Sequence, residues 1–262
     1  MEYLYGQASV LAALTFRQRN IYRLMVHDTR GNFFAAMMED EDNCRVTKSI
    51  KIAKEIKIPI RFVDSHQLKK FVKEKRHQNV VLEVGPYPDH WVTSCQSTPE
   101  GIKFLNENRE AGFYNSHLIL AFNHPNDTGN LGNVIRTACF FGVPVIVDTR
   151  HSCSLTPTVS ANSAGALETT KVFKVKTMST FLKSLDGFNI IGADCSQGTL
   201  IRDLKLKGPT VLVLGNEKHG IDQSCKPLCN TLVRIPGCSS SPDCLDSLNV
   251  SVAAGILLSH LK

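Results

Sequence analysis

The sequence lacks any long hydrophobic segment. No apolar run approaches the roughly 18 residues that a membrane-spanning helix needs, although hydrophobic residues make up 42% of the 262 residues. The first residues, MEYLYGQASVLAAL, contain Glu2 and no basic cluster. We therefore expect neither a signal peptide nor a visible transit peptide, although a trimmed amino terminus stays compatible with this pattern. The length allows one large domain or two smaller ones, each with its own core.

The cysteine content also disfavours a disulfide framework. The nine cysteines are odd in number and most lie among apolar or small residues, which favours free thiols in a reducing compartment. The last four are spaced C-x3-C and C-x5-C, unlike the short knuckles of structural zinc sites. We expect no metal site, with zinc as the disfavoured alternative for Cys225, Cys229, Cys238 and Cys244.

Positive charge is concentrated in one part of the chain. Residues 1–85 contain 15 Lys and Arg against 10 Asp and Glu, whereas residues 86–262 contain 15 against 14. A basic amino-terminal region predicts contact with a polyanion. A solvated basic face that binds nothing is equally compatible with the charge alone.

Hydrophobic periodicity divides the chain into two α/β regions. Residues 1–85 predict a small domain, and Ile50, Ala53 and Ile56 share the apolar face of one of its helices. Its expected helices span 7–14, 47–58 and 65–76, its expected strands span 21–28, 58–64 and 80–84, and EDED at 39–42 is expected to be a loop.

Residues 86–114 begin with a proline-rich stretch and are predicted to be a linker. In residues 115–262 several strands are continuous apolar runs, which predicts a mostly parallel sheet covered on both faces. The expected strands are 117–122, 143–148, 171–175, 188–194, 210–215 and 231–235, with helices starting near Asn130, Thr156, Met178 and Asp222 and a buried helix starting at Ser247.

The first candidate site is NHPNDTGNLGNVIRTACFFG at 123–142. Its G-x-x-G spacing departs from the G-x-G-x-x-G of dinucleotide-binding turns, which disfavours a nucleotide-dependent oxidoreductase. Asn130 is suited to cap the helix. Arg136 lies about two turns into an otherwise apolar helix, where an arginine pairs either with a bound phosphate or carboxylate or with an acidic residue of the chain.

The second and third candidate sites also follow expected strands. In VLVLGNEKHGID at 211–222, Glu217 follows a strand-ending glycine, and no P-loop lysine accompanies it. A carboxylate there suits a hydroxyl or amine partner, such as the edge of a ribose. In 235–256, Asn249 is expected in the first turn of the last helix, where its amide needs hydrogen-bond partners.

These three segments, in this order, resemble the signature motifs of the SpoU-type (TrmH-like) RNA ribose methyltransferases of the SPOUT superfamily. Asn130, Gly132 and Arg136 are in register with the first motif. Residues 1–85 resemble the small ribosomal-protein-like RNA-binding domain that often precedes this catalytic domain. The chain departs from the pattern at Thr128, where the family usually has Pro, at Asn133, where it commonly has Ala, and at Ala161, where a basic residue is common.

The resemblance implies a carboxyl-terminal trefoil knot, S-adenosylmethionine as cofactor, no metal and a homodimer. Within this family, the chain most resembles mitochondrial large-subunit rRNA enzymes, which modify a guanosine in the peptidyl-transferase region. The resemblance therefore implies rRNA or an assembling large subunit as the partner, and a mitochondrial location. A tRNA 2′-O-methyltransferase and a non-catalytic ribosome-assembly protein stay as alternatives. The implied catalytic residues are Arg136, Asn130, Glu217, Ser247 and Asn249, and the implied cofactor-binding residues are Leu214, Gly215, Asn216, Ile235, Pro236 and Leu248. The basic residues expected to contact RNA are Arg17, Arg19, Lys69, Lys70, Lys73 and Arg76.

Overall fold

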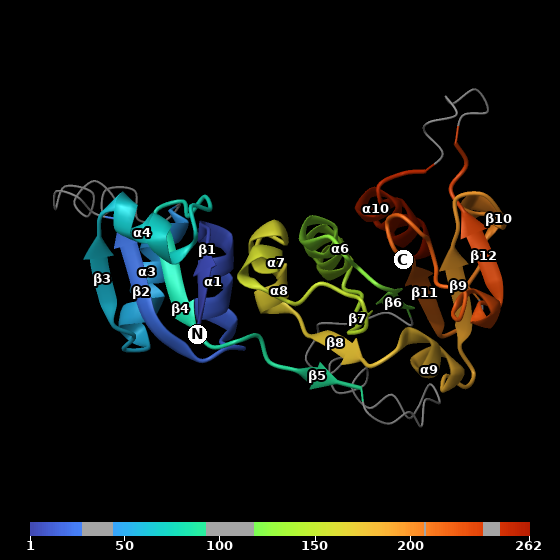
Figure 1. The fold of residues 1–262 in the computed structure, drawn as a ribbon, viewed down its shortest axis with the longest axis horizontal. Coiled ribbons are helices and arrows are strands. Elements are labelled where there is room, and N and C mark those ends of the chain that lie inside the picture. The colour runs from blue at the N-terminus through green and yellow to red at the C-terminus, as the bar shows by residue number, and fades with distance from the viewer. Residues whose placement is uncertain (28–43, 93–117, 207, 238–246) are drawn as a thin grey trace. The chain divides into compact units, whose positions relative to one another are not determined.

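The structure is a computed structural model that describes residues 1–27, 44–92, 118–206, 208–237 and 247–262. The described chain divides into two compact units (Figure 1). The first contains residues 1–88 and 155–169, and the second contains residues 89–154 and 170–262. The segment 155–169 therefore groups with the amino-terminal residues, although the sequence predicted it within the carboxyl-terminal domain. The predicted loop at 39–42 and most of the predicted linker lie outside the described residues.

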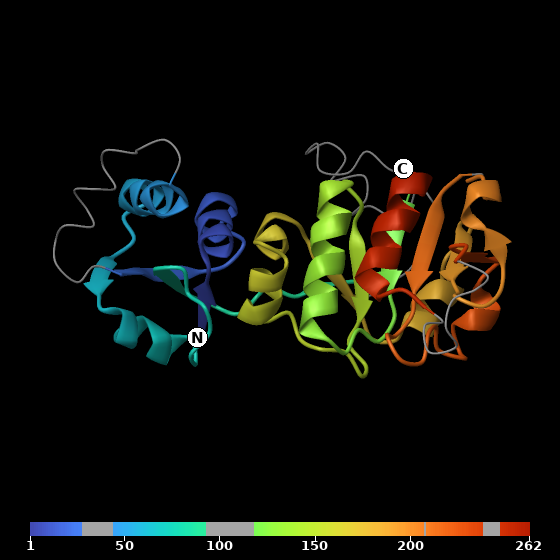
Figure 2. The same ribbon diagram turned by 90° about the horizontal axis from the view of Figure 1, so that it is seen from above.

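The first unit is a four-stranded sheet with helices on both faces. Strand order is β1-β4-β2-β3, in which β2 and β3 are parallel and the other pairs antiparallel. Figure 2 shows α1 and α3 over one face and α4 over the other. The elements are β1 (Glu2–Tyr5), α1 (Gln7–Phe16), β2 (Ile21–His27), α3 (Arg45–Glu55), β3 (Ile60–Val63), α4 (Ser65–Phe71), β4 (Val80–Val84), α7 (Pro157–Asn162) and α8 (Ala166–Thr169).

Alternating side chains explain the two cores of this sheet. Leu24 and Leu82 pack with the apolar face of α3 formed by Ile50 and Ala53, as the sequence predicted. Met25, the neighbour of Leu24, points to the opposite face and packs under α4. The helix predicted at 65–76 starts as expected, with Asp64 as its cap, but it ends already at Phe71. Lys73 and Glu74 then adopt left-handed backbone angles that an α-helix excludes.

Helices α7 and α8 pack against α1 in the same unit. Gly165 has φ +85°, and a Cβ atom there would lie 2.7 Å from the carbonyl oxygen of Ala8. Only glycine therefore permits this close approach. The Tyr5 hydroxyl donates a hydrogen bond to Thr158 Oγ1 over 3.2 Å, which adds a polar contact to the packing.

The second unit is an eight-stranded sheet in which every strand pair is parallel, as the apolar runs predicted. Its strand order is β10-β12-β9-β11-β6-β7-β8-β5. The elements are β5 (His90–Trp91), β6 (Leu118–Phe122), α6 (Thr128–Phe140), β7 (Val145–Asp148), β8 (Val172–Val175), α9 (Met178–Lys183), β9 (Asn189–Ala193), β10 (Thr199–Leu200), the 3-10 helix η1 (Ile201–Asp203), β11 (Thr210–Leu214), the 3-10 helix η2 (Lys226–Leu228), β12 (Thr231–Arg234) and α10 (Val250–Leu261).

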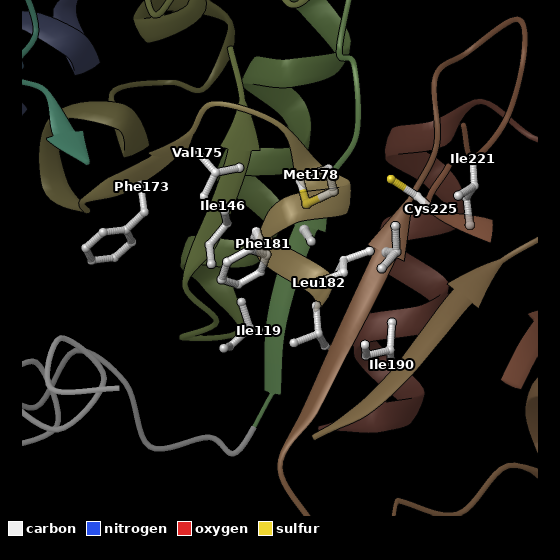
Figure 3. Packing of buried hydrophobic residues seen from close by; sticks show 13 residues of the cluster. Ile119, Ile146, Phe173, Val175, Met178, Phe181, Leu182, Ile190, Ile221 and Cys225 are labelled. Carbon is white, nitrogen blue, oxygen red and sulfur yellow. The ribbon is translucent and has the colours of Figure 1, made fainter. Parts of the chain in front are cut away.

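Helix α9 packs on one face of this sheet. Figure 3 shows its residues Met178, Phe181 and Leu182 in the same cluster as Ile119 of β6 and Ile146 of β7. Helices α6 and α10 pack against each other (Figures 1 and 2). The candidate site lies at the carboxyl ends of strands β6, β7 and β11.

Three expectations about this unit were wrong. No α-helix follows Asp222, where the chain instead forms turns and the short helix η2. The last helix starts at Val250, with Asn249 as its cap, rather than at Ser247. It is not buried all round, because the side chains of Val252 and Ile256 are 51% and 39% exposed.

Candidate functional site

The first two motifs lie at one edge of the parallel sheet. Strands β6 and β11 are neighbours, with Phe122 opposite Leu214 at their carboxyl ends. The loop that leads into α6 and the turn that contains Glu217 therefore start side by side. In open α/β sheets this edge is where ligands bind.

Asp127, rather than Asn130, caps helix α6. Its Oδ1 atom accepts a hydrogen bond from the backbone N–H of Asn130 over 2.7 Å. The sequence had assigned the cap to Asn130, three residues too late. Because Asp127 satisfies the helix start, the Asn130 side chain is available for contacts outside the helix.

One hydrogen-bond chain joins all three motifs. Asn130 Nδ2 donates to Glu217 Oε1 over 3.2 Å, and Asn249 Nδ2 donates to Asn130 Oδ1 over 2.9 Å. Asn249 Oδ1 in turn accepts from the backbone N–H and the hydroxyl of Ser251 over 2.9 and 2.6 Å. We call Glu217, Asn130 and Asn249 the three-motif network. The amide of Asn249 thus has the partners that the sequence required, although its side chain is exposed.

Arg136 lies on the exposed side of α6. Of the two partners that the sequence left open, an acidic residue is not found, since Arg136 makes no ion pair or hydrogen bond within the described parts of the chain. The Glu217 carboxylate, for which the sequence suggested a hydroxyl or amine partner, bonds the amide of Asn130. The guanidinium is therefore available for a bound anion.

A tight turn after β11 fixes Glu217. Asn216 and Gly220 exchange backbone hydrogen bonds of 2.8 and 2.9 Å, and Asn216 Oδ1 accepts from the backbone N–H groups of Lys218 and His219. A Cβ atom on Gly215 would lie 2.1 Å from the carbonyl carbon of Gly220. Gly215 is therefore needed by the turn itself, a reason that the sequence did not reveal.

The other expected cofactor-binding residues differ in exposure. Leu214 is buried at the end of its strand and Ile235 is half-buried after β12. Pro236 and Leu248 are exposed, as is the expected catalytic residue Ser247, and they flank residues 238–246, which lie outside the described chain. Asn216 itself is nearly buried.

The sequence missed a buried carboxylate, Asp148, at the end of β7. Its Oδ1 accepts from the His124 backbone N–H and from Ser152 Oγ over 2.8 and 2.9 Å. Its Oδ2 accepts from Asn123 Nδ2 over 3.2 Å and lies 2.8 Å from His124 Nε2. Burial raises the pKa of Asp148. An aspartate that directly ends an apolar run, as in VPVIVD, was the available signal.

Cys153 is near the network but is not a nucleophile. Burial, followed by the negative charge of Glu217, raises the pKa of its thiol to about 11. The thiolate is the reactive form of cysteine, so this thiol stays inert at neutral pH. In the described residues no group of three or more His, Cys, Asp or Glu side chains could hold a metal ion, and no helix is long and apolar enough to cross a membrane.

The structure corrects one of the expected RNA contacts in the first unit. The side chains of Arg17, Lys69, Lys70, Lys73 and Arg76 are exposed. Arg19 is only 5% exposed and makes a bidentate pair with Glu168, with both distances 2.8 Å. It also bonds Glu2 over 2.6 Å and lies over the ring of Tyr87. The positive charge of Arg19 is therefore paired within the fold, and we remove Arg19 from the expected RNA-binding residues.

The comparisons with known proteins identify the family of each part of the chain. Residues 117–259 match the SpoU rRNA Methylase family, and residues 3–90 match the RNA 2′-O ribose methyltransferase substrate-binding family. The fold and the three motifs thus define an RNA 2′-O-ribose methyltransferase. The chain belongs to the SpoU rRNA methylase family.

Relatives extend over nearly the whole chain. It is 32% identical to the human mitochondrial rRNA methyltransferase 1, over 98% of this chain and 71% of the relative. It is 31% identical to the Saccharomyces cerevisiae mitochondrial rRNA methyltransferase 1, over 99% of this chain and 69% of the relative.

Solved structures support the fold. The SpoU methyltransferase AviRb from Streptomyces viridochromogenes, solved with AdoMet, has a TM-score of 0.70 and 18% identity, over 98% of this chain and 88% of AviRb. A TrmH-family protein from Porphyromonas gingivalis has a TM-score of 0.68 and 21% identity, over 100% and 89% of the two chains.

Proposed function

We propose that this protein transfers a methyl group from S-adenosylmethionine to the ribose 2′-oxygen of a guanosine in mitochondrial large-subunit rRNA. The observation that carries the proposal is the three-motif network, together with an exposed arginine of the first motif that has no partner in the described chain. The rRNA substrate and the mitochondrial location are supported by the human and yeast relatives, which are mitochondrial rRNA methyltransferases.

Bound cofactor would supply an electrophilic methyl group on a sulfonium. The turn at Gly215 and Asn216, together with Leu214, Ile235, Pro236 and Leu248, is the proposed binding surface. No metal is required for this chemistry, because the remaining demands are alignment of the 2′-oxygen, a dry site and removal of its proton.

Arg136 is the proposed essential residue. A guanidinium keeps its proton in proteins and is a poor base. It is suited to hold a neighbouring phosphate of the RNA and to stabilise the negative charge that develops on the 2′-oxygen. Asn130 and Asn249 would orient the ribose, with Ser247 beside them, and Glu217 would hold Asn130 in place.

The basic surface of the first unit is proposed to bind RNA. Lys69 and Lys70 lie in the last turn of α4, and Lys73 and Arg76 follow it, all exposed. Phosphate contacts of this type give affinity without sequence choice. A ribose must be accessible for methylation, so we infer that a single-stranded or looped segment is recognised.

We also propose a homodimer with a trefoil knot in each second unit, as the family resemblance implies. The dimer is supported by three apolar side chains on the packed helices α6 and α10. Phe140, Val252 and Ile256 are 84%, 51% and 39% exposed. Val252 and Ile256 lie one helical turn apart on the same side of α10, and exposed apolar residues grouped on one face are typical of an interface.

The test is methyl transfer from labelled S-adenosylmethionine to unmodified mitochondrial large-subunit rRNA. We expect label at one guanosine, in a linkage that resists alkaline cleavage, and loss of transfer in Arg136→Ala. Arg202→Ala is the matched control, because Arg202 is 70% exposed in the same unit and makes only a 3.9 Å contact with Asp203. This control should retain wild-type transfer.

Other outcomes separate the alternatives. Transfer to tRNA but not to rRNA would identify a tRNA enzyme instead. Tight binding of S-adenosylhomocysteine without transfer to RNA or to isolated large subunits would favour a non-catalytic assembly protein. Absence of both transfer and cofactor binding would contradict the proposed activity altogether.

A further inference from the structure

Asp148 is a buried carboxylate that the proposed reaction does not use directly. It has no exposed surface at the end of β7, in the interior of the parallel sheet. Each of its oxygens has two polar partners, contributed by Asn123, His124 and Ser152. Burying a carboxylate is unfavourable unless it is paired and hydrogen-bonded. This complete set of partners means that the local loops are arranged around Asp148.

His124 connects Asp148 to the turn that contains Glu217. It bonds Asp148 through both its backbone N–H and its imidazole. Its carbonyl oxygen accepts a hydrogen bond from Asn216 Nδ2 over 2.8 Å. The same Asn216 Nδ2 lies 3.3 Å from Glu217 Oε2. Two residues therefore link Asp148 to the three-motif network.

A second link fixes the far end of the same turn. Asn123, whose Nδ2 bonds Asp148, accepts through Oδ1 a hydrogen bond from the backbone N–H of Asp222 over 3.0 Å. The turn that starts at Asn216 is thus held on both sides by the loop after β6. That loop is held by Asp148.

The backbone of His124 has an uncommon conformation. It has φ +54°, a left-handed value that few residues other than glycine adopt. Surrounding contacts stabilise such a conformation. Here they are the two contacts with Asp148 and the contact with Asn216.

We propose that Asp148 and His124 are positioning residues for methyl transfer. They act through Asn216 to direct the Glu217 carboxylate toward Asn130, and so set the amide that orients the ribose. This inference rests on the proposed function. It predicts a defect in the chemical step rather than in RNA affinity, because neither residue is proposed to contact RNA.

The kinetic test compares Asp148→Asn, His124→Leu and His124→Gln in the full-length protein. Asp148→Asn keeps the shape but places an amide donor where four donors converge, and His124→Leu removes the imidazole contact. We expect both to lower kcat by about 10- to 100-fold, since small misplacements of reacting groups have effects of this size. The KM for RNA should stay within about twofold of wild type. His124→Gln, which keeps a donor, should recover much of the loss.

Glu83→Gln is the control for a general effect of losing a buried carboxylate. Glu83 is 5% exposed and pairs with Arg23 over 2.6 Å in the first unit, without a bond to the three-motif network. It should change the melting temperature but not kcat. An unchanged kcat in folded Asp148→Asn would overturn the proposal. So would an equal fall in Glu83→Gln, or a rise confined to KM.

A spectroscopic measurement tests positioning without activity. The side-chain amide ¹H–¹⁵N signals of Asn130 should shift in Asp148→Asn and His124→Leu, and stay unchanged in Glu83→Gln. Failure of wild-type methyl transfer would count against the proposed function alone. Unchanged Asn130 signals in both variants would overturn the positioning role, whatever the activity.

Discussion

Asn249 donates a hydrogen bond to Asn130 over 2.9 Å, which joins residues 119 positions apart in the sequence. This bond connects the start of α10 to the start of α6. It also makes Asn249 serve two purposes, because its oxygen caps α10 while its nitrogen reaches the three-motif network. These two purposes can be separated by mutation.

Asn249→Ala removes both contacts, whereas Asn249→Ser keeps a capping hydroxyl but is too short to bond Asn130. We expect Asn249→Ala to lose about 1 kcal/mol of unfolding free energy, the usual effect of a lost cap, and Asn249→Ser to lose much less. Methyl transfer should fall to the same extent in both variants. Urea denaturation and single-turnover kinetics measure the two effects. Wild-type transfer in Asn249→Ser would show that Asn249 acts as a cap alone.

The Arg19–Glu168 pair gives a prediction about stability. Arg19→Ala would leave Glu168 fully buried without its bidentate partner. Removing one member of a buried ion pair is destabilising by about 3–5 kcal/mol. We expect a loss of this size by urea denaturation, against less than about 0.5 kcal/mol for Arg17→Ala, since Arg17 is exposed. A loss in Arg19→Ala no greater than in Arg17→Ala would contradict a stabilising role for the pair.

Much of the fold followed from hydrophobic periodicity alone. The strands of the second unit were predicted because apolar runs such as 118–122 and 210–214 are buried along their whole length. The expected helix after Asp222 failed because Pro227, five residues later, lacks the N–H that a helix interior requires. Helix α10 was misjudged as wholly buried, since its composition is apolar all round and its exposed side is set by packing on α6.

The site depended on information that local sequence does not contain. Glu217 and Asn130 are 87 positions apart, and only the order of the three motifs pointed to their association. Arg19 was taken for a surface cation because its partner Glu168 is 149 residues away. Asp148 was overlooked for the same reason, because its role depends on loops that follow different strands.

The buried thiols predict a stability change at high pH. Burial raises the pKa of Cys153, Cys225 and Cys229 to about 11, from an ordinary value of 9.0. The unfolded chain therefore releases these protons first as the pH rises. Stability should be complete below about pH 9 and fall between about pH 9 and 11, because the unfolded state then binds fewer protons.

Urea midpoints measured from pH 7 to 11 would test this prediction. Replacing Cys225 with Ala should make the decline shallower, although the small cavity lowers stability at every pH. A decline that is equally steep in the variant would mean that Cys225 does not contribute. Alkylation of the three thiols by iodoacetamide should also be slow at pH 8, because few thiolates are present.

Salt dependence tests the proposed RNA surface. If Lys70 contacts a phosphate, Lys70→Ala should weaken RNA binding and reduce the slope of log K against log salt by about 0.7, the value for one single-strand phosphate contact. Lys183→Ala is the control, because Lys183 is an exposed lysine in the last turn of α9. Filter binding over a range of salt concentrations gives both slopes. Equal slopes for wild type and Lys70→Ala would remove Lys70 from the RNA-binding surface.

The exposed apolar face of α10 predicts the oligomeric state. A glutamate at position 256 would place a charge beside the exposed Val252 and against its counterparts in a second copy, where desolvation of the charge is unfavourable. We expect Ile256→Glu to sediment as a monomer while wild type and the exposed-loop control Gln223→Glu sediment as dimers. The melting temperature of Ile256→Glu should then lose its dependence on protein concentration, because association no longer contributes to stability. A dimeric Ile256→Glu variant would show that this face of α10 lies outside the interface.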